Sequence, residues 1–192
     1  MTHPARLPAL FFVVSLFCGC VQQANVKPAS DGTISVKLAL NWYPEVEHGG
    51  FVAAKTLGLY ESEKLDVELI PGGPGAPQLV ITELAAERIL FAVSDADNVV
   101  KARASGLPIV AVLAPLQNSP RCIMVHLASG FKTLEDLADI ELAISETRPF
   151  ALWMKKNLPL KNVQLVPFGG SVGEFLLKSE FAQQAYVFSE PF

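Results

Sequence analysis

Short apolar runs alternate with amphipathic segments along the chain after Gly32. Runs rich in Val, Ile and Leu that are bounded by Gly, Pro, Asn or Asp are typical of strands, and the longer segments between them are typical of helices. The pattern predicts strands at 35–40, 65–70, 89–93, 109–113, 122–125, 142–144, 163–166 and 185–188. It predicts helices at 50–57, 77–86, 96–104, 134–137, 149–156 and 172–178. This alternation indicates an α/β fold with mostly parallel sheets and helices on both faces.

The alternation is interrupted at residues 114–120, which read APLQNSP. Two prolines and three polar residues stand where the next element would be expected, and such a stretch is typical of a connection. We therefore expect two lobes, with lobe 1 at 33–116 and lobe 2 at 117–188.

The first twenty residues have the features of an export signal. His3 and Arg6 supply a short basic region, and an apolar run follows at 7–17. A membrane-spanning helix needs about 20 apolar residues, so this shorter run favours a secretory signal over an anchor helix.

The end of this leader, Phe17-Cys18-Gly19-Cys20, resembles a bacterial lipoprotein cleavage site. Cys20 would then be the lipidated first residue of the mature protein, and the polar stretch 21–32 would be its tether. An ordinary cleaved signal is the alternative. Either way, the protein is expected outside the cytoplasm, in the periplasm or on the extracellular face.

Composition disfavours several kinds of partner. The formal net charge is −4, and the sequence contains no cluster of Lys and Arg, so nucleic acid and anionic lipid surfaces are not expected partners. Membrane contact is expected only through the lipid on Cys20. Beyond the leader, Cys122 is the one remaining cysteine, and no Cys/His spacing suggests a metal site. The sequence predicts no cofactor.

The residues with the most chemical information follow two predicted strands. Asn41 and Trp42 come after strand 35–40, and Gly72-Gly73 come after strand 65–70. Open α/β sheets bind ligands outside the carboxyl ends of their strands, so both loops are expected at a ligand site. The indole of Trp42 can stack on a planar ring, Asn41 can both donate and accept hydrogen bonds, and the glycines let the backbone approach a ligand.

The same stretch resembles a known family. Asn-Trp-x-Pro at the end of a strand, followed by His48, a Gly and the phrase Ala54-Lys55-x-x-Gly58-Leu59, is similar to the periplasmic substrate-binding proteins of ABC importers, in the branch that binds thiamine pyrimidine precursors. The resemblance implies a two-lobed, type II binding protein that closes by a hinge. Its ligand would be a small heteroaromatic pyrimidine, and its partner an ABC permease in the inner membrane.

The resemblance continues to the last residues. Residues 186–192 read YVFSEPF and resemble the Tyr-Val-x-Ser-Glu-Pro segment through which the family's chain returns to its first lobe. We therefore expect 189–192 to begin a return crossover, and the last part of lobe 1 to be missing.

Five further residues are candidates for the ligand site, each with a structural alternative. Asp95 either caps a helix or accepts a ligand amino group. Gln117 and Glu190 lie on the two expected crossovers, where Glu190 accepts hydrogen bonds from an aminopyrimidine or forms a hinge salt bridge. His48 contacts the ligand or sits at a helix start. Phe150 closes over the ligand ring opposite Trp42 or packs as a helix staple.

Two other functions remain open. A receptor for sulfonate, nitrate or taurine would need a basic residue in the cleft, and only Arg121 and Arg148 are near it. The fungal pyrimidine synthases resemble these receptors but carry a cofactor-binding lysine and a reactive histidine, where this sequence has Ser94 and Asn98. Common hydrolase, P-loop and zinc motifs are absent from the sequence, so we expect a binding protein and not an enzyme.

Overall fold

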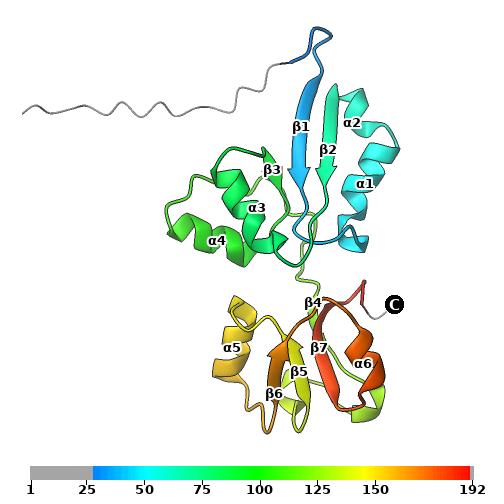
Figure 1. The fold of residues 1–192 in the computed structure, drawn as a ribbon, viewed down its shortest axis with the longest axis vertical. Helices are drawn as coiled ribbons and strands as arrows, with labels where there is room; N and C mark the ends of the chain where they lie inside the picture. The colour runs from blue at the N-terminus through cyan, green and yellow to red at the C-terminus, as the bar shows by residue number, and fades with distance from the viewer. Residues whose placement is uncertain (1–27, 191–192) are drawn as a thin grey trace, which may run out of the picture.

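A computed structural model of the chain describes residues 28–190. The predicted export signal, Cys20 and most of the predicted tether lie outside the described residues. The described part forms two α/β units joined by an extended segment (Figure 1). No helix among residues 28–190 is long and apolar enough to cross a membrane.

Lobe 1 is built on a parallel sheet with the strand order β2-β1-β3. The strands are β1 (Ile34–Ala39), β2 (Leu65–Ile70) and β3 (Phe91–Ala92). The helices are α1 (Gly49–Thr56), α2 (Leu59–Ser62), α3 (Ala76–Ala85) and α4 (Ala96–Ala104), with a 3₁₀ turn at Val46–His48 before α1. Helices α1 and α2 lie on one side of the sheet, and α3 and α4 on the other (Figure 1). Ala39, Val80 and Ile89 form the buried core of this lobe.

Lobe 2 is a mixed sheet with the order β4-β7-β5-β6. Its strands are β4 (Arg121–Met124), β5 (Glu141–Ile144), β6 (Gln164–Pro167) and β7 (Phe181–Tyr186). Strand β5 runs parallel to β6 and β7, whereas β4 is antiparallel to β7. The helices are α5 (Pro149–Asn157) and α6 (Gly173–Leu177), with 3₁₀ turns at Leu127–Ser129 and Leu134–Asp136. The core contains Leu137, Ile140, Leu142, Ile144, Ala151, Met154, Leu158 and Ala182.

Lobe 2 starts and ends at neighbouring points. Arg121, the first residue of β4, pairs with Tyr186, the last residue of β7. The backbone N–H of Val187 donates to the carbonyl of Pro120 at 2.9 Å, which extends this pairing beyond the sheet. The chain therefore enters and leaves lobe 2 through two adjacent backbone segments.

One predicted strand is wrong. Residues 109–113 are not a strand, and in the described part of the chain they pair with no neighbouring backbone. Ile109 is buried, but the side chains of Val110, Val112 and Leu113 are more than 70 % exposed. An apolar run becomes a strand only when a neighbouring strand shares hydrogen bonds with it. Strand β3 lies at the edge of the lobe 1 sheet and is paired with β1 alone, so segment 109–113 has not joined the sheet beside it.

Three other predictions need correction. Strand β7 runs over Phe181–Tyr186 and not over the predicted 185–188, because it includes two glutamines, at 183 and 184, that are buried in the sheet and lack the apolar composition by which strands are predicted. Segment 134–137 is a 3₁₀ turn and not an α-helix. Helix α2 was not predicted, and it begins directly after Gly58, whose φ of +69° is a left-handed conformation that glycine adopts readily.

Candidate ligand-binding site

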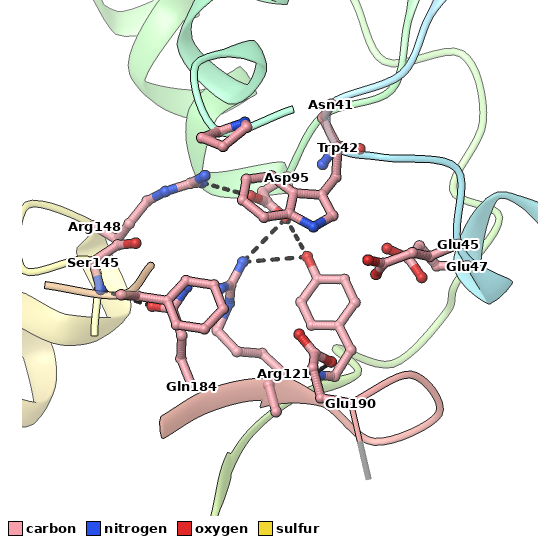
Figure 2. Close-up of a pocket in the computed structure, with 14 residues that line it drawn as sticks. Asn41, Trp42, Glu45, Glu47, Asp95, Arg121, Ser145, Arg148, Gln184 and Glu190 are labelled. Carbon is pink, nitrogen blue, oxygen red and sulfur yellow. Dashed lines mark hydrogen bonds and ion pairs between the residues drawn. The ribbon is translucent and has the colours of Figure 1, made fainter. Parts of the chain in front are cut away.

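The carboxyl ends of the lobe 1 strands face those of β5, β6 and β7 in lobe 2 (Figure 1). The loops after β1, β2 and β3 come from lobe 1, and those after β5, β6 and β7 come from lobe 2. Each sheet therefore presents to the other lobe the edge at which open α/β sheets bind ligands. A cavity of about 130 Å³ lies there. Lobe 1 contributes Asn41, Trp42, Glu45, Glu47, Pro74 and Asp95, lobe 2 contributes Arg121, Ser145, Arg148, Phe168, Gln184, Ala185 and Tyr186, and Glu190 comes from the segment that follows lobe 2 (Figure 2).

Asp95 is the main polar link between the lobes. It is the N-cap residue of α4, but its side chain makes no capping hydrogen bond. Instead, its Oδ2 accepts from Arg148 Nη1 at 2.6 Å, and its Oδ1 accepts from Arg121 Nη2 at 3.3 Å and from the hydroxyl of Tyr186 at 3.1 Å (Figure 2). The three donors belong to different elements of lobe 2. Asp95 is therefore already paired with positive charge in the structure.

The donors around Asp95 are held in place by packing. The guanidinium of Arg121 lies 4.4 Å from the ring centre of Phe150 and 5.2 Å from that of Tyr186, which are favourable cation–π distances. Burial and the negative charge of Asp95 both raise the pKa of Tyr186, so its hydroxyl stays protonated and can donate. Phe150 itself packs against the core of lobe 2 and does not line the cavity.

Trp42 reaches from lobe 1 to lobe 2. Its ring lies nearly parallel to that of Phe168, with an interplanar angle of 25° and 6.5 Å between ring centroids. Gly170 makes room for the indole, because a Cβ at this position would lie 3.1 Å from Trp42 Cζ2. A planar ring between two aromatic rings needs two contacts of about 3.5–4.0 Å each. The distance between the two ring centroids is slightly less than the sum of two such contacts.

Three glutamates line one side of the cavity. Glu45 and Glu47 lie side by side before α1, and Glu190 lies beneath them after β7 (Figure 2). Burial, followed by the nearby charges of Glu47 and Glu190, raises the pKa of Glu45. Burial is also the largest cause that raises the pKa of Glu47, and its Oε2 is buried without a hydrogen-bond partner. Glu190 accepts from the backbone N–H of Tyr186 at 2.8 Å and from the Ser189 hydroxyl.

His48 positions Asn41. The imidazole is 1 % exposed and does not line the cavity. The backbone N–H of Glu45 can only donate, and it points at Nδ1 of His48 at 3.3 Å, so Nε2 carries the proton and donates to Asn41 Oδ1 at 3.1 Å. Burial lowers the pKa of His48, which agrees with a neutral ring. The amide NH₂ of Asn41 is consequently left to face the cavity as a donor.

The other predicted residues lie outside the cavity lining. Gly72 brings two loops together, because a Cβ there would lie closer than 3.0 Å to backbone atoms of Leu40 and Trp42. Gly73 packs beneath the ring of Tyr43. Gln117 is exposed and donates to the carbonyl of Ala114 at 2.6 Å. Of the nine predicted ligand-binding residues, four line the cavity: Asn41, Trp42, Asp95 and Glu190.

Sequence reasoning missed most of the lobe 2 lining. Phe168 could have been found from the sequence, because it is an aromatic residue that directly follows β6 and precedes Gly169-Gly170. Trp42 has a similar position, since it follows β1 and lies against Gly72. Gln184 gave no signal, because its role depends on the fold: its Oε1 accepts from the backbone N–H of Ser145 at 2.7 Å and fixes the loop after β5. In the described range, no group of three His, Cys, Asp or Glu residues is arranged to hold a metal ion.

Comparison with known proteins identifies the family. Residues 45–174, more than half of the chain, match the family described as NMT1/THI5 like. The chain belongs to this family. The matched range contains eight of the fourteen residues that line the cavity, while Asn41, Trp42, Gln184, Ala185, Tyr186 and Glu190 lie outside it.

Three curated relatives of this NMT1/THI5-like chain are similar in sequence. A putative thiamine biosynthesis protein of Haemophilus influenzae is 32 % identical over 53 % of this chain and 32 % of its own length. A formylaminopyrimidine-binding protein of Halalkalibacterium halodurans is 26 % identical over 70 % of this chain and 40 % of its own. A 4-amino-5-hydroxymethyl-2-methylpyrimidine phosphate synthase of Legionella pneumophila is 28 % identical over 53 % and 32 %. The NMT1/THI5-like chain thus spans less than half the length of the relatives it matches.

A solved structure shows the same fold. The alkanesulfonate-binding protein SsuA from Xanthomonas axonopodis pv. citri, bound to MOPS, superposes with a TM-score of 0.56 over 79 % of this chain and 54 % of its own, at 16 % identity. The predicted α/β fold of a periplasmic binding protein, with mostly parallel sheets, is therefore confirmed for this member of the NMT1/THI5-like family.

Proposed function

We propose that this protein is an extracytoplasmic solute receptor that binds a small aminopyrimidine and delivers it to an ABC permease. One observation carries the choice of ligand. Three glutamates face the cavity, while the two arginines that line it are paired with Asp95. The cavity therefore has an excess of hydrogen-bond acceptors and negative charge, and it favours a ligand that offers N–H donors or a positive charge.

An aminopyrimidine suits these glutamates chemically. Its exocyclic amine donates, and its ring nitrogen accepts a hydrogen bond. A carboxyl group with a raised pKa, such as that of Glu45 or Glu47, can hold a proton next to a ring nitrogen and accept from the amine at the same time. The unpartnered Oε2 of Glu47 would gain the hydrogen bond it lacks.

The aromatic residues support a flat ligand. Trp42 and Phe168 are nearly parallel and come from opposite lobes, so a small opening of the cleft would admit a planar ring between them. Asn41 offers its amide NH₂ to a ring substituent. Similarity to a protein named as a formylaminopyrimidine-binding protein supports the same ligand class.

Binding would act through closure of the lobes. A ligand that touches both lobes binds the closed form more tightly than the open form, so it shifts the population toward closure. The adjacent backbone segments at Pro120 and Val187 would act as the hinge, and the permease would recognise the closed form.

An anion receptor is the second candidate, because Arg121 and Arg148 line the cavity. Asp95 argues against it, since a second anion would have to displace this carboxylate. A synthase is supported by similarity to one relative that is named as a synthase. However, Ser94 and Asn98 stand where the fungal synthases are expected to carry their lysine and histidine, so we propose a binding role.

The test is titration calorimetry with the full chain and three compounds: 4-amino-5-hydroxymethyl-2-methylpyrimidine, taurine and nitrate. We expect the pyrimidine to bind with micromolar or better affinity, which corresponds to about −8 kcal/mol. Taurine and nitrate should give no heat. Binding of an anion with no response to the pyrimidine would overturn the proposed ligand class.

We also propose that the protein is anchored through a lipid on Cys20. Metabolic labelling of cells with a fatty-acid analogue should mark the wild-type protein, and Cys20→Ala should abolish the label. Cys122→Ala is the matched control and should keep it, because Cys122 belongs to the folded part of the chain. Labelling that persists in Cys20→Ala would contradict the anchor.

A further inference from the structure

We propose that the carboxylate of Asp95 fills an oxyanion-binding cluster on lobe 2 in place of a dissolved anion. Because this cluster is already filled, the cavity rejects anionic ligands. The inference refines the proposed function by naming the residue that sets the charge selectivity of the site. It depends on the geometry around Asp95 and on which lobe each partner belongs to.

The cluster consists of Arg121, Arg148 and Tyr186, which converge on one carboxylate from three elements of lobe 2. Arg121 starts β4, Arg148 is the N-cap of α5, and Tyr186 ends β7. Together they direct two guanidinium N–H groups and one hydroxyl at the two oxygens of Asp95. Charged donors of this kind bind carboxylate, sulfonate and phosphate groups strongly.

Two members of this cluster, Arg121 and Tyr186, are also held together by contacts that do not involve Asp95. Arg121 is held over Phe150 and beside the ring of Tyr186, to which it also donates a hydrogen bond at 3.3 Å. The side chains of Arg121 and Arg148 are 19 % and 14 % exposed, so both charges are largely withdrawn from water. Without a carboxylate, these two positive charges would remain partly buried and unpaired, which is unfavourable unless another anion binds.

Asp95 competes with any dissolved anion at an advantage. It is attached to lobe 1 and reaches the cluster by lobe closure alone, and a group attached in this way acts at an effective concentration of the order of millimolar. The cavity that contains the two arginines is also lined by Asp95, Glu45 and Glu47, so like-charge repulsion would oppose the binding of a sulfonate or phosphate.

The proposal predicts that removal of this one carboxylate creates an anion site. In the full chain, Asp95→Ala should bind methanesulfonate at least tenfold more tightly than the wild type, measured by titration calorimetry at constant ionic strength. Asp97→Ala is the matched control, because Asp97 lies two residues away on α4 and contacts only the backbone N–H of Asn98. It removes the same charge and should leave methanesulfonate binding at the wild-type level.

Two further variants show whether a gain in methanesulfonate affinity comes from the cluster. If Asp95→Ala does not fold, Asp95→Asn, which keeps the size of the side chain, should still gain methanesulfonate affinity. Adding Arg148→Met to either Asp95 variant should abolish the gain, because it removes one donor of the cluster. An equal gain in Asp97→Ala, or no gain in a folded Asp95 variant, would overturn the proposal.

The pyrimidine measurement is independent of this result. If the wild type binds no pyrimidine but Asp95→Ala gains methanesulfonate, the proposed function fails and the role of Asp95 stands. If the wild type binds the pyrimidine and a folded Asp95→Ala gains nothing, the ligand class stands, and Asp95 is no more than a link between the lobes.

Discussion

Trp42 is the residue on which a flat ligand would depend most. Stacking of a heteroaromatic base on an aromatic side chain is worth about 1–3 kcal/mol by alanine substitution. We therefore expect Trp42→Ala to weaken pyrimidine binding by about that amount, and Trp42→Phe, which keeps a ring opposite Phe168, to weaken it less. Calorimetry with the three proteins measures the difference.

The chain provides a matched control for this experiment. Trp153, the second tryptophan, lies half exposed on α5 and does not line the cavity. Trp153→Ala should keep the wild-type affinity. If Trp42→Ala binds the pyrimidine as tightly as Trp153→Ala does, the stacking role is excluded.

Replacement of Glu47 by glutamine should stabilise the folded protein and weaken ligand binding. Burial raises the pKa of Glu47, so the folded protein holds this proton more tightly than the unfolded chain does, and the stabilisation from the neutral form is lost as pH rises through the raised pKa. At neutral pH, Glu47→Gln removes the unfavourable buried charge. We expect Tm to rise by about 2–4 °C, equivalent to about 1 kcal/mol for a chain of this size. Pyrimidine binding should weaken in the same variant.

The pH dependence separates this effect from a general one. The gain in Tm from Glu47→Gln should shrink as pH falls and vanish below the ordinary glutamate pKa of about 4.3, where wild-type Glu47 is also neutral. Glu63→Gln, at an exposed position after α2, should change neither Tm nor affinity. A constant Tm difference from pH 4 to pH 8 would show that the charge of Glu47 is not the cause.

At the scale of elements, Gly72 couples the loop after β2 to the loop after β1. A Cβ there would lie closer than 3.0 Å to the Leu40 carbonyl and to two backbone atoms of Trp42, and its N–H donates to Trp42 O at 2.9 Å. Overpacking of this kind costs about 1–3 kcal/mol. We expect Gly72→Ala to lower the free energy of unfolding by that amount and to weaken pyrimidine binding through displacement of Trp42.

Gly49 offers the opposite case for the same substitution. It has φ of −54° at the start of α1, and a Cβ there would meet nothing within 4 Å. Gly49→Ala should therefore be neutral or stabilise the protein by up to about 1 kcal/mol, because alanine favours the helix. Chemical denaturation of both variants tests the pair, and equal losses of stability would refute the close-packing argument for Gly72.

The elements differ in how far the sequence determines them. Helix α4 and strand β2 form at the predicted residues, because Gly106 follows the last turn of α4 and Pro71-Gly72 follow β2 directly. Segment 109–113 has the composition of a strand, but the described chain offers it no pairing partner. Strand β7 carries buried glutamines, whose hydrogen bonds to other loops cannot be read locally.

The candidate site shows the same limit. Residues that follow a strand and carry unusual chemistry, such as Asn41 and Trp42, could be predicted from the local pattern. The partners of Asp95 lie 26, 53 and 91 residues away in sequence and belong to the other lobe. Their convergence depends on lobe closure, which no local pattern encodes.

At the scale of the whole molecule, the interactions of Asp95 with lobe 2 should also favour the closed form of the ligand-free protein. Hydrogen bonds to charged groups contribute about 1.5–3 kcal/mol, so the loss of the charge in Asp95→Asn should reduce the closure equilibrium by about tenfold or more. Small-angle X-ray scattering of the ligand-free protein should then show a larger radius of gyration. Asp97→Asn should scatter as the wild type does, and an unchanged Asp95→Asn would mean that closure rests on other contacts, such as Trp42 with Phe168.

The pairing of Arg121 with Tyr186 has a consequence for how two-lobed proteins of this fold diversify. Because the two ends of lobe 2 lie side by side, the whole lobe is connected to the rest of the protein at one place. Recombination at two sites in the coding sequence, before 121 and after 186, could exchange the whole lobe. Such an exchange would replace the oxyanion cluster and Phe168 together and leave Asn41, Trp42 and the glutamates before α1 untouched. The two halves of the candidate site could therefore be inherited from different ancestors.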